Sequence, residues 1–281
     1  MDKIWVTGGS GQLGRSIKDA VGENADFVFT DSKTVNLTDH AAVRAFVCQH
    51  NIKSIINCAA YTAVDDAEDV PESAFAVNHL AVKNLAELSK EFGLKLIHMS
   101  TDYVFDGEGN VPYKSSDRTN PINVYGNSKR EGEKAIVEIA PPNTIIIRTA
   151  WVYSKYGKNF VNTMLRLAEN NTQLKVVNDQ FGAPTSARSI AKVVLEILPQ
   201  LHNSKPEIFH YTNAGICTWF DFSKEIFKIK GLDIAVIPVS SEQFVTKAKR
   251  PKYSVLCNSK ISNAFGVVSP EWQQELKDYL S

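Results

Sequence analysis

Lys3-Ile4-Trp5-Val6-Thr7-Gly8-Gly9-Ser10-Gly11-Gln12-Leu13-Gly14 is the stretch that decides the fold class. The first five residues predict a strand, and residues 15–21 continue with helical spacing. Strand, glycine turn and helix follow each other in the order of a dinucleotide-binding βαβ unit, in which a pyrophosphate lies at the helix N-terminus. The expected cofactor contacts in this turn are Gly8, Gly11, Leu13 and Gly14. A glycine-rich turn without a ligand is the alternative.

The rest of the chain fits an α/β fold. Apolar runs alternate with helical patterns, which predicts a Rossmann-type doubly wound parallel sheet. After Pro199 the alternation becomes less regular, so we expect a smaller α/β substrate-binding lobe. The expected dinucleotide-binding domain covers residues 1–150 plus about 174–200, and the expected lobe covers about 151–173 and 201–281. The predicted strands include 27–30, 54–60, 95–99, 144–148, 174–177 and 209–212, and the predicted helices include 39–50, 71–92, 125–137 and 186–201.

Composition narrows the class of protein. The 281 residues carry no formal net charge, so no basic excess indicates a nucleic acid or an anionic membrane as partner. The sequence has no leading secretion signal and no apolar run near the ~18 residues that a membrane span needs, so we expect a cytoplasmic protein. Its four cysteines lack paired metal-ligand spacing and are expected to be reduced. These features are typical of an enzyme-sized globular protein.

Asp31 follows the predicted second strand and bears on the choice of cofactor. A carboxylate there can accept hydrogen bonds from both ribose hydroxyls and repel a 2′-phosphate, which favours NADH over NADPH. Lys33 lies two residues on and could pair with that phosphate, so use of both cofactors stays open. A solvated loop aspartate is the alternative.

Two further strands end in residues suited to a site. The run 54–60 ends in Ala59-Ala60, whose small side chains would let a cofactor lie against the backbone, and Tyr61 then leaves at the ligand-binding edge of the sheet. The strand 95–99 delivers Ser100 and Thr101 at its tip. A hydroxyl there can hold a ketone oxygen during reduction. Thr101 is our candidate, with Ser100 as the fallback.

Tyr125 and Lys129 are four residues apart, which places them one turn apart on one face of the predicted helix. A tyrosine phenol titrates near pH ~10, and a neighbouring ammonium favours the phenolate. We therefore expect Tyr125 to exchange a proton with a substrate oxygen closer to neutral pH. A chance occurrence of this spacing is the alternative.

Two stretches in the second half suggest substrate contacts. Trp151 follows the strand 144–148, and an indole there could pack on the apolar face of a sugar, although a core tryptophan is equally compatible. Arg250 lies in the basic cluster 247–252, which could close on a nucleotide diphosphate or be a solvated loop.

Together with the glycine turn, Thr101 and the Tyr125/Lys129 pair, four longer strings carry a family resemblance. The chain resembles the dTDP-4-dehydrorhamnose reductase family of the extended short-chain dehydrogenases/reductases, from Lys3 to about Leu280. The strings are Asn57-Cys58-Ala59-Ala60-Tyr61-Thr62-Ala63-Val64-Asp65, Ser100-Thr101-Asp102-Tyr103-Val104-Phe105-Asp106-Gly107, Arg148-Thr149-Ala150-Trp151-Val152-Tyr153 and Asp179-Gln180-Phe181-Gly182-Ala183-Pro184-Thr185.

The resemblance implies a reaction and a set of roles. NAD(P)H would deliver hydride to C4 of dTDP-4-dehydro-β-L-rhamnose in the synthesis of dTDP-L-rhamnose. Tyr125 would donate the proton, Lys129 would lower the pKa of the phenol and hold the nicotinamide ribose, and Thr101 would orient the ketone. Family cofactor positions fall on Gln12, Asp31, Asn36, Leu37, Ala60 and Met99, and family sugar positions fall on Thr62, Val64, Asp102 and Trp151.

One departure from the family concerns a metal. Some members dimerise through Mg²⁺ held by glutamates on the first helix and on the helix after the Asp179–Thr185 turn. Those positions correspond to Ser16 and Arg188, neither of which is an anionic oxygen ligand. We therefore expect no Mg²⁺ requirement, and a monomer or weak homodimer.

Two other functions stay open. A related nucleotide-sugar reductase or epimerase would share these motifs, but an epimerase retains NAD⁺ whereas a reductase exchanges its cofactor at every turnover. A non-catalytic regulatory subunit of the same fold, like the methionine adenosyltransferase β subunit, is the other alternative. The intact Thr101, Tyr125 and Lys129 argue against it.

Overall fold

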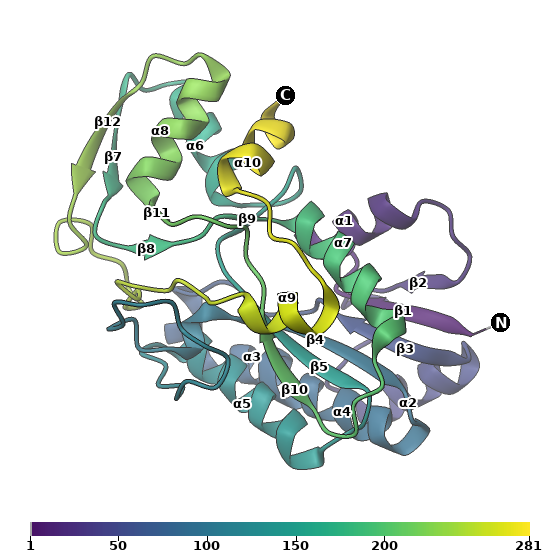
Figure 1. Cartoon of the computed structure of the whole chain (residues 1–281). Coiled ribbons are helices and arrows are strands. Elements are labelled where there is room, and N and C mark those ends of the chain that lie inside the picture. Colours follow the sequence, from purple (N-terminus) through teal and green to yellow (C-terminus); the bar gives the residue numbers. More distant parts are fainter. Residues whose placement is uncertain (1) are drawn as a thin grey trace.

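A computed structural model describes residues 2–281 of the protein. Its centre is a six-stranded sheet in the order β10-β5-β4-β3-β1-β2, and every pair of neighbours is parallel (Figure 1). The predicted parallel α/β sheet is thereby confirmed. Its strands are β1 (Lys3–Thr7), β2 (Phe27–Phe29), β3 (Ile52–Asn57), β4 (Lys95–Thr101), β5 (Thr144–Thr149) and β10 (Glu207–His210).

Helices cover both faces of this sheet because alternate residues of its strands point to opposite sides. Val6 and Ile56 pack in one core with α1 and α7, whereas Trp5 and Ile55 pack in a second core with α2 and α4. A third core joins α5 to β5 through Ile136 and Ile146. The helices are α1 (Gln12–Val21), α2 (His40–Gln49), α4 (Ala81–Phe92), α5 (Val124–Ile139), α7 (Ala187–Ile197) and α9 (Ser259–Phe265).

A smaller lobe lies at one end of the sheet, at the upper left of Figure 1. Its own core includes Phe222 and Trp272. The lobe contains β7 (Gln173–Val177), β12 (Ala235–Val239), α6 (Phe160–Ala168), α8 (Trp219–Lys230) and α10 (Trp272–Leu280). Short elements complete the chain: β6 (Val152–Tyr153) with β9 (Thr185–Ser186), β8 (Phe181–Gly182) with β11 (Cys217–Thr218), and the 3₁₀ turns Asp66–Glu68, Asp102–Val104 and Leu198–Gln200.

The expected boundary between the two parts is wrong at two strands. The predicted strand 174–177 was placed in the dinucleotide-binding domain, but β7 pairs with β12 in the smaller lobe. The predicted strand 209–212 was placed in the lobe, but β10 pairs with β5 at the edge of the central sheet. Burial does not separate the two strands, because each begins with an exposed residue and ends with two buried ones.

The expected helix over 71–92 is confirmed, and it contains a π-helical turn. It consists of α3 (Pro71–Phe75), a π-helical turn at Ala76–Leu80 and α4. Such a turn holds an extra residue, which redirects the side chains within it. Asn78 lies in this turn and is completely buried.

The glycine turn shows why two of its glycines are needed. Gly8 has a φ of +63°, and a Cβ there would lie 2.7 Å from the backbone nitrogen of Ala59. A Cβ on Gly14 would lie 2.4 Å from the carbonyl oxygen of Gly8. The turn is therefore packed against the segment after β3 and against its own helix. Across residues 2–281, none of the helices combines the length and the apolar character needed to cross a bilayer.

Candidate active site

Thr101 and Tyr125 meet where β4 ends and α5 begins. Asn123 caps α5, and its side-chain oxygen accepts a 2.7 Å hydrogen bond from the N–H of Gly126. A Cβ on Gly126 would lie 2.1 Å from the carbonyl oxygen of Tyr103, so the first turn of α5 rests directly on the backbone after β4. This close approach brings the rings of Tyr103 and Tyr125 to a centroid distance of 5.6 Å.

Tyr125 is a weaker acid in the structure than the sequence suggests. Burial, with a smaller contribution from the charge of Asp102, raises the pKa of Tyr125 to about 12, and a hydrogen bond with Thr101 only partly opposes this. The expected lowering by Lys129 is absent because the ammonium turns away and donates a 2.6 Å hydrogen bond to the carbonyl oxygen of Met99. The phenol therefore keeps its proton at neutral pH, which is the form a proton donor needs.

Lys129 is itself buried, with 2 % of its surface exposed. Burial lowers the pKa of Lys129 to about 8, although the charges of Glu133 and Cys58 oppose this. Its Nζ lies 3.5 Å from Nε2 of His98. The lysine thus changes charge much nearer to neutral pH than an exposed lysine does.

Thr101 and Asp102, at the end of β4, lie next to the phenol of Tyr125. The hydroxyl of Thr101 donates a 3.0 Å hydrogen bond to Oδ1 of Asp102. Burial raises the pKa of Asp102 to about 6, and its Oδ2 is buried without a hydrogen-bond partner among residues 2–281. The fallback Ser100 points elsewhere, because its hydroxyl donates to Oε1 of Glu133 at 2.5 Å.

A cavity of about 320 Å³ lies at the carboxyl ends of β1, β2 and β3. Eight of the residues that we predicted as cofactor contacts line it: Gly8, Gly11, Asp31, Asn36, Leu37, Ala59, Ala60 and Tyr61. Gln12, Leu13, Gly14 and Met99 do not line it, and Gln12 instead accepts hydrogen bonds from Ser154 and Asn159. The sequence reasoning missed other lining residues, among them Ser10, Thr30, Thr38 and Val77. They lie beside motif residues and carry no distinctive pattern of their own.

Asp31 carries a negative charge at the rim of this cavity. Its Oδ1 accepts hydrogen bonds from the hydroxyl and the N–H of Thr34 and from the N–H of Lys33, and these bonds lower the pKa of Asp31. The carboxylate is therefore ionised and held in place at the end of β2.

A second cavity, of about 220 Å³, lies in the smaller lobe against Tyr103. Aromatic residues and cations share its wall, including Phe160, Trp219, Lys175 and Arg250. Arg250 is anchored by a 2.6 Å ion pair with Asp65, while its Nη1 is buried without a partner among residues 2–281. The two expected sugar contacts Thr62 and Val64 line neither cavity.

Trp151 also stands outside both cavities. Its ring stacks on Trp219 with a centroid distance of 3.4 Å and an angle of 8° between the planes. Its backbone has a φ of +49°, in the left-handed region that side chains rarely adopt. Trp151 therefore packs behind Trp219, and it is Trp219 that lines the second cavity.

Asn78 ties the loop after β3 to the helix that carries Tyr125. Its Oδ1 accepts a 2.9 Å hydrogen bond from the N–H of Tyr61, and its Nδ2 donates to the carbonyl oxygen of Tyr61 and to the hydroxyl of Ser128, both at 3.0 Å. An asparagine among apolar neighbours is the sequence signal for such a structural role.

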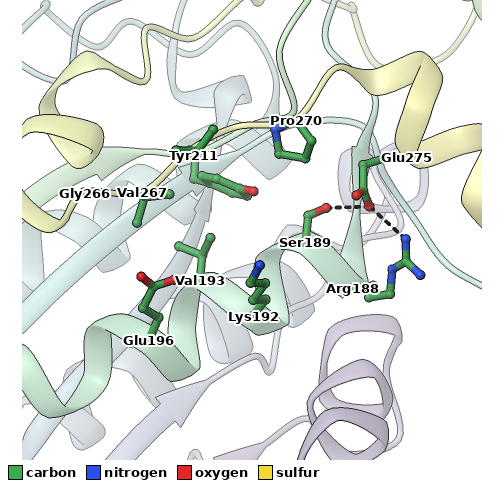
Figure 2. A pocket seen from close by; sticks show the side chains of 11 residues that line it. Arg188, Ser189, Lys192, Val193, Glu196, Tyr211, Gly266, Val267, Pro270 and Glu275 are labelled. Atoms are coloured by element: carbon green, nitrogen blue, oxygen red, sulfur yellow. Dashed lines mark hydrogen bonds and ion pairs between the residues drawn. The ribbon is translucent and has the colours of Figure 1, made fainter.

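Ser16 and Arg188, the two positions at which some family members bind Mg²⁺, make other contacts in this structure. Ser16 donates to the carbonyl oxygen of Gln12, while Arg188 lies 3.5 Å from Glu275 and 3.6 Å from Asp278 on α10. Figure 2 shows Arg188 and Ser189 of α7 both directed toward Glu275. Residues 2–281 contain no cluster of three or more metal-ligating side chains.

Comparisons with known proteins agree over the whole chain. A family model described as "RmlD substrate binding domain" matches residues 2–281. A dTDP-4-dehydrorhamnose reductase of Sinorhizobium fredii is 41 % identical over 98 % of this chain and 95 % of its own. A solved dTDP-4-dehydrorhamnose reductase of Clostridium acetobutylicum is 42 % identical, with a TM-score of 0.94 over 99 % of this chain and 98 % of its own. The enzyme of that name from Bacillus anthracis, solved in complex with NADP, is 36 % identical, with a TM-score of 0.93 over 99 % of both chains.

Proposed function

The chain belongs to the RmlD substrate-binding domain family, and we propose that it reduces the C4 ketone of dTDP-4-dehydro-β-L-rhamnose to dTDP-L-rhamnose with NAD(P)H. The observation that carries this proposal is the meeting of Thr101 and Tyr125 where β4 ends, at the same edge of the parallel sheet as the cavity of about 320 Å³. That edge is where open α/β sheets bind their ligands.

The 320 Å³ cavity fits the nucleotide part of the cofactor. Its glycine turn has no room for side chains, so the backbone of Gly8 and Gly11 can approach a pyrophosphate at the start of α1. Asp31 can accept hydrogen bonds from the adenosine ribose, and Ala59 and Ala60 can lie beneath it. When bound, the dihydronicotinamide supplies the hydride.

Two residues then act on the ketone oxygen. Thr101 lies next to the phenol and can help to orient the oxygen as negative charge develops on it. Tyr125 donates its phenolic proton to the alkoxide, and its high pKa ensures that this proton is present at neutral pH. Lys129, one helical turn beyond Tyr125, is proposed to hold the nicotinamide ribose.

The 220 Å³ cavity suits the nucleoside diphosphate of the substrate. Trp219 and Phe160 offer aromatic surfaces for a base, while Lys175 and Arg250 offer positive charge for phosphates. The cavity is next to Tyr103, whose ring contacts Tyr125, so a sugar attached to that diphosphate can reach the phenol.

The finer features of the proposal follow from charge. The ionised Asp31 favours NADH, with NADPH as a second cofactor. Ser16 and Arg188 cannot serve as anionic metal ligands, so the enzyme needs no Mg²⁺ and is a monomer or weak homodimer. Its proposed location is the cytoplasm.

The test is loss of NADH or NADPH absorbance with dTDP-4-dehydro-L-rhamnose generated in situ. The wild type should turn over, and Tyr125→Phe should lose a factor of ~100 or more in kcat while it still binds cofactor. Tyr156→Phe is the matched control, because it removes a phenol that lines neither cavity. Cofactor binding without wild-type turnover would refute the proposed substrate, and tightly retained NAD⁺ would indicate an epimerase.

A further inference from the structure

A row of buried polar side chains runs beneath the site from the glycine turn to Lys129. Thr7, Asn57 and His98 are the facing residues of β1, β3 and β4, and none is more than 2 % exposed. The hydroxyl of Thr7 is 2.6 Å from Oδ1 of Asn57, and Nδ2 of Asn57 is 2.9 Å from Nδ1 of His98. Nε2 of His98 then faces Nζ of Lys129 at 3.5 Å.

The backbone fixes the orientation of Asn57. The N–H of Ala59, which can only donate, points at Oδ1 of Asn57 at 3.2 Å. The opposite amide orientation would place two donors face to face in a buried site. The side of Asn57 that faces His98 is therefore its NH₂ group.

This orientation selects one tautomer of His98. Nδ1 must offer a lone pair to the Asn57 amide, so the proton of the neutral ring is on Nε2. The imidazolium is disfavoured because its Nδ1–H would face the Asn57 donor and its positive charge would lie beside Lys129. Burial and the charge of Lys129 accordingly hold the pKa of His98 well below its usual value.

The consequence falls on Lys129. We propose that His98 is a positioning residue, which presents an N–H rather than a lone pair to Nζ of Lys129, opposes the ammonium form and leaves the lysine to reach toward the cofactor. The 3.5 Å separation is longer than an ordinary N–H hydrogen bond, as expected for an ammonium facing a donor. Met99 supplies the acceptor on the other side at 2.6 Å.

The other groups around the lysine act in the opposite direction. Glu133, on the same helix, and Cys58, after β3, both favour the charged form, yet the pKa of Lys129 is lowered to about 8. Burial is the main cause. In the proposal, the N–H of His98 and burial both lower the pKa of Lys129. A role of Lys129 in catalysis rests on the proposed reductase activity, but the contacts of His98 with Asn57 and Lys129 do not.

The first test is a spectrum of the wild-type protein, which needs no substrate and uses variants only to assign the signals. Nitrogen NMR of ¹⁵N-histidine-labelled protein should show His98 with Nε2 protonated and Nδ1 unprotonated from about pH 5 to 9. The His98 signals are identified by their loss in His98→Leu, and His50→Leu is the control. An Nδ1–H tautomer, or an imidazolium within that range, would overturn the proposal.

The second test measures the lysine. In protein labelled at the lysine ε-carbon, the Lys129 resonance should titrate about one pH unit higher in His98→Leu than in the wild type or in His50→Leu. An unchanged or lower titration would leave His98 with a packing role only and refute the proposal. If His98→Leu does not fold, Asn57→Asp replaces it, since its carboxylate accepts from Nδ1–H and turns a lone pair toward the lysine. Both measurements stand even if the proposed substrate is wrong.

Discussion

Arg148 on β5 and Glu133 on α5 form a bidentate ion pair inside the protein. Nε of Arg148 is 2.9 Å from Oε1 of Glu133, and Nη2 is 2.6 Å from Oε2. The two side chains are only 3 % and 4 % exposed. Glu133 lies one helical turn beyond Lys129, so this pair also fixes the helix that carries the site.

Removal of one partner should destabilise the protein strongly. Arg148→Met removes the ion-pair partner of the buried Glu133 carboxylate and leaves it only the hydroxyl of Ser100, which we expect to lower the free energy of unfolding by about 3–5 kcal/mol. Denaturant unfolding monitored by circular dichroism measures this change. The double variant Arg148→Met/Glu133→Leu should recover most of the loss. The exposed pair Lys228–Glu225 gives the control, since Lys228→Met should cost less than about 1 kcal/mol.

Asp102 should make stability depend on pH. Its carboxyl titrates at an ordinary value of 3.8 when unfolded and at about 6 in the folded protein. Between these values the folded state holds more protons, so this group's contribution to stability falls as pH rises from about 4 to 6. The free energy of unfolding of Asp102→Asn, relative to that of the wild type, should rise by on the order of 3 kcal/mol between about pH 4 and pH 6. Urea unfolding at pH 4 and 7 tests this. A difference between the proteins that does not change with pH would contradict it.

Asp31 should control the choice between the two cofactors. Asp31→Asn removes the charge that would repel a 2′-phosphate, so the ratio of kcat/KM for NADPH to that for NADH should rise about tenfold. Asp26→Asn, at the opposite end of β2, is the control and should leave the ratio as in the wild type. An unchanged ratio in Asp31→Asn would show that the carboxylate does not face the ribose.

Arg250 should contribute to substrate binding. Arg250→Ala removes the cation at the 220 Å³ cavity, and we expect KM for the nucleotide sugar to rise about tenfold with a smaller change in kcat. Lys252→Ala, which removes an exposed cation from the same cluster, should leave KM nearly unchanged. Equal effects of the two substitutions would indicate general electrostatic attraction rather than a contact.

Removal of metal should not affect the reaction. Because Arg188 provides a cation where an anionic ligand would be needed, activity after dialysis against EDTA should stay within about twofold of the untreated enzyme. Steady-state rates with and without added Mg²⁺ check this. A loss that Mg²⁺ restores would refute metal independence.

The central strands and the edge that holds the site could be predicted because both are local properties of the sequence. Continuous apolar runs that end in small or hydroxyl residues, such as those leading to Ala59 and Thr101, are typical of buried parallel strands. The places of β7 and β10 could not be predicted. Both are short, and which sheet each joins depends on pairing with residues tens of positions away.

The chemistry of the site was predicted less completely than its position. The spacing of Tyr125 and Lys129 predicts that they share a helix face, and they do. It could not predict that burial would raise the pKa of the phenol and lower that of the lysine, because burial is a tertiary property. Likewise, the π-helical turn at Asn78 depends on packing that no residue pattern encodes.

The stacked indoles of Trp151 and Trp219 have an optical consequence. Trp151 follows β5 of the central sheet, and Trp219 begins α8 of the smaller lobe, so the stack joins the two parts of the molecule. Two chromophores 3.4 Å apart couple their electronic transitions, and the coupling changes steeply with separation and angle. The near-ultraviolet circular dichroism of the unlabelled protein should therefore report any change in the angle between the lobes.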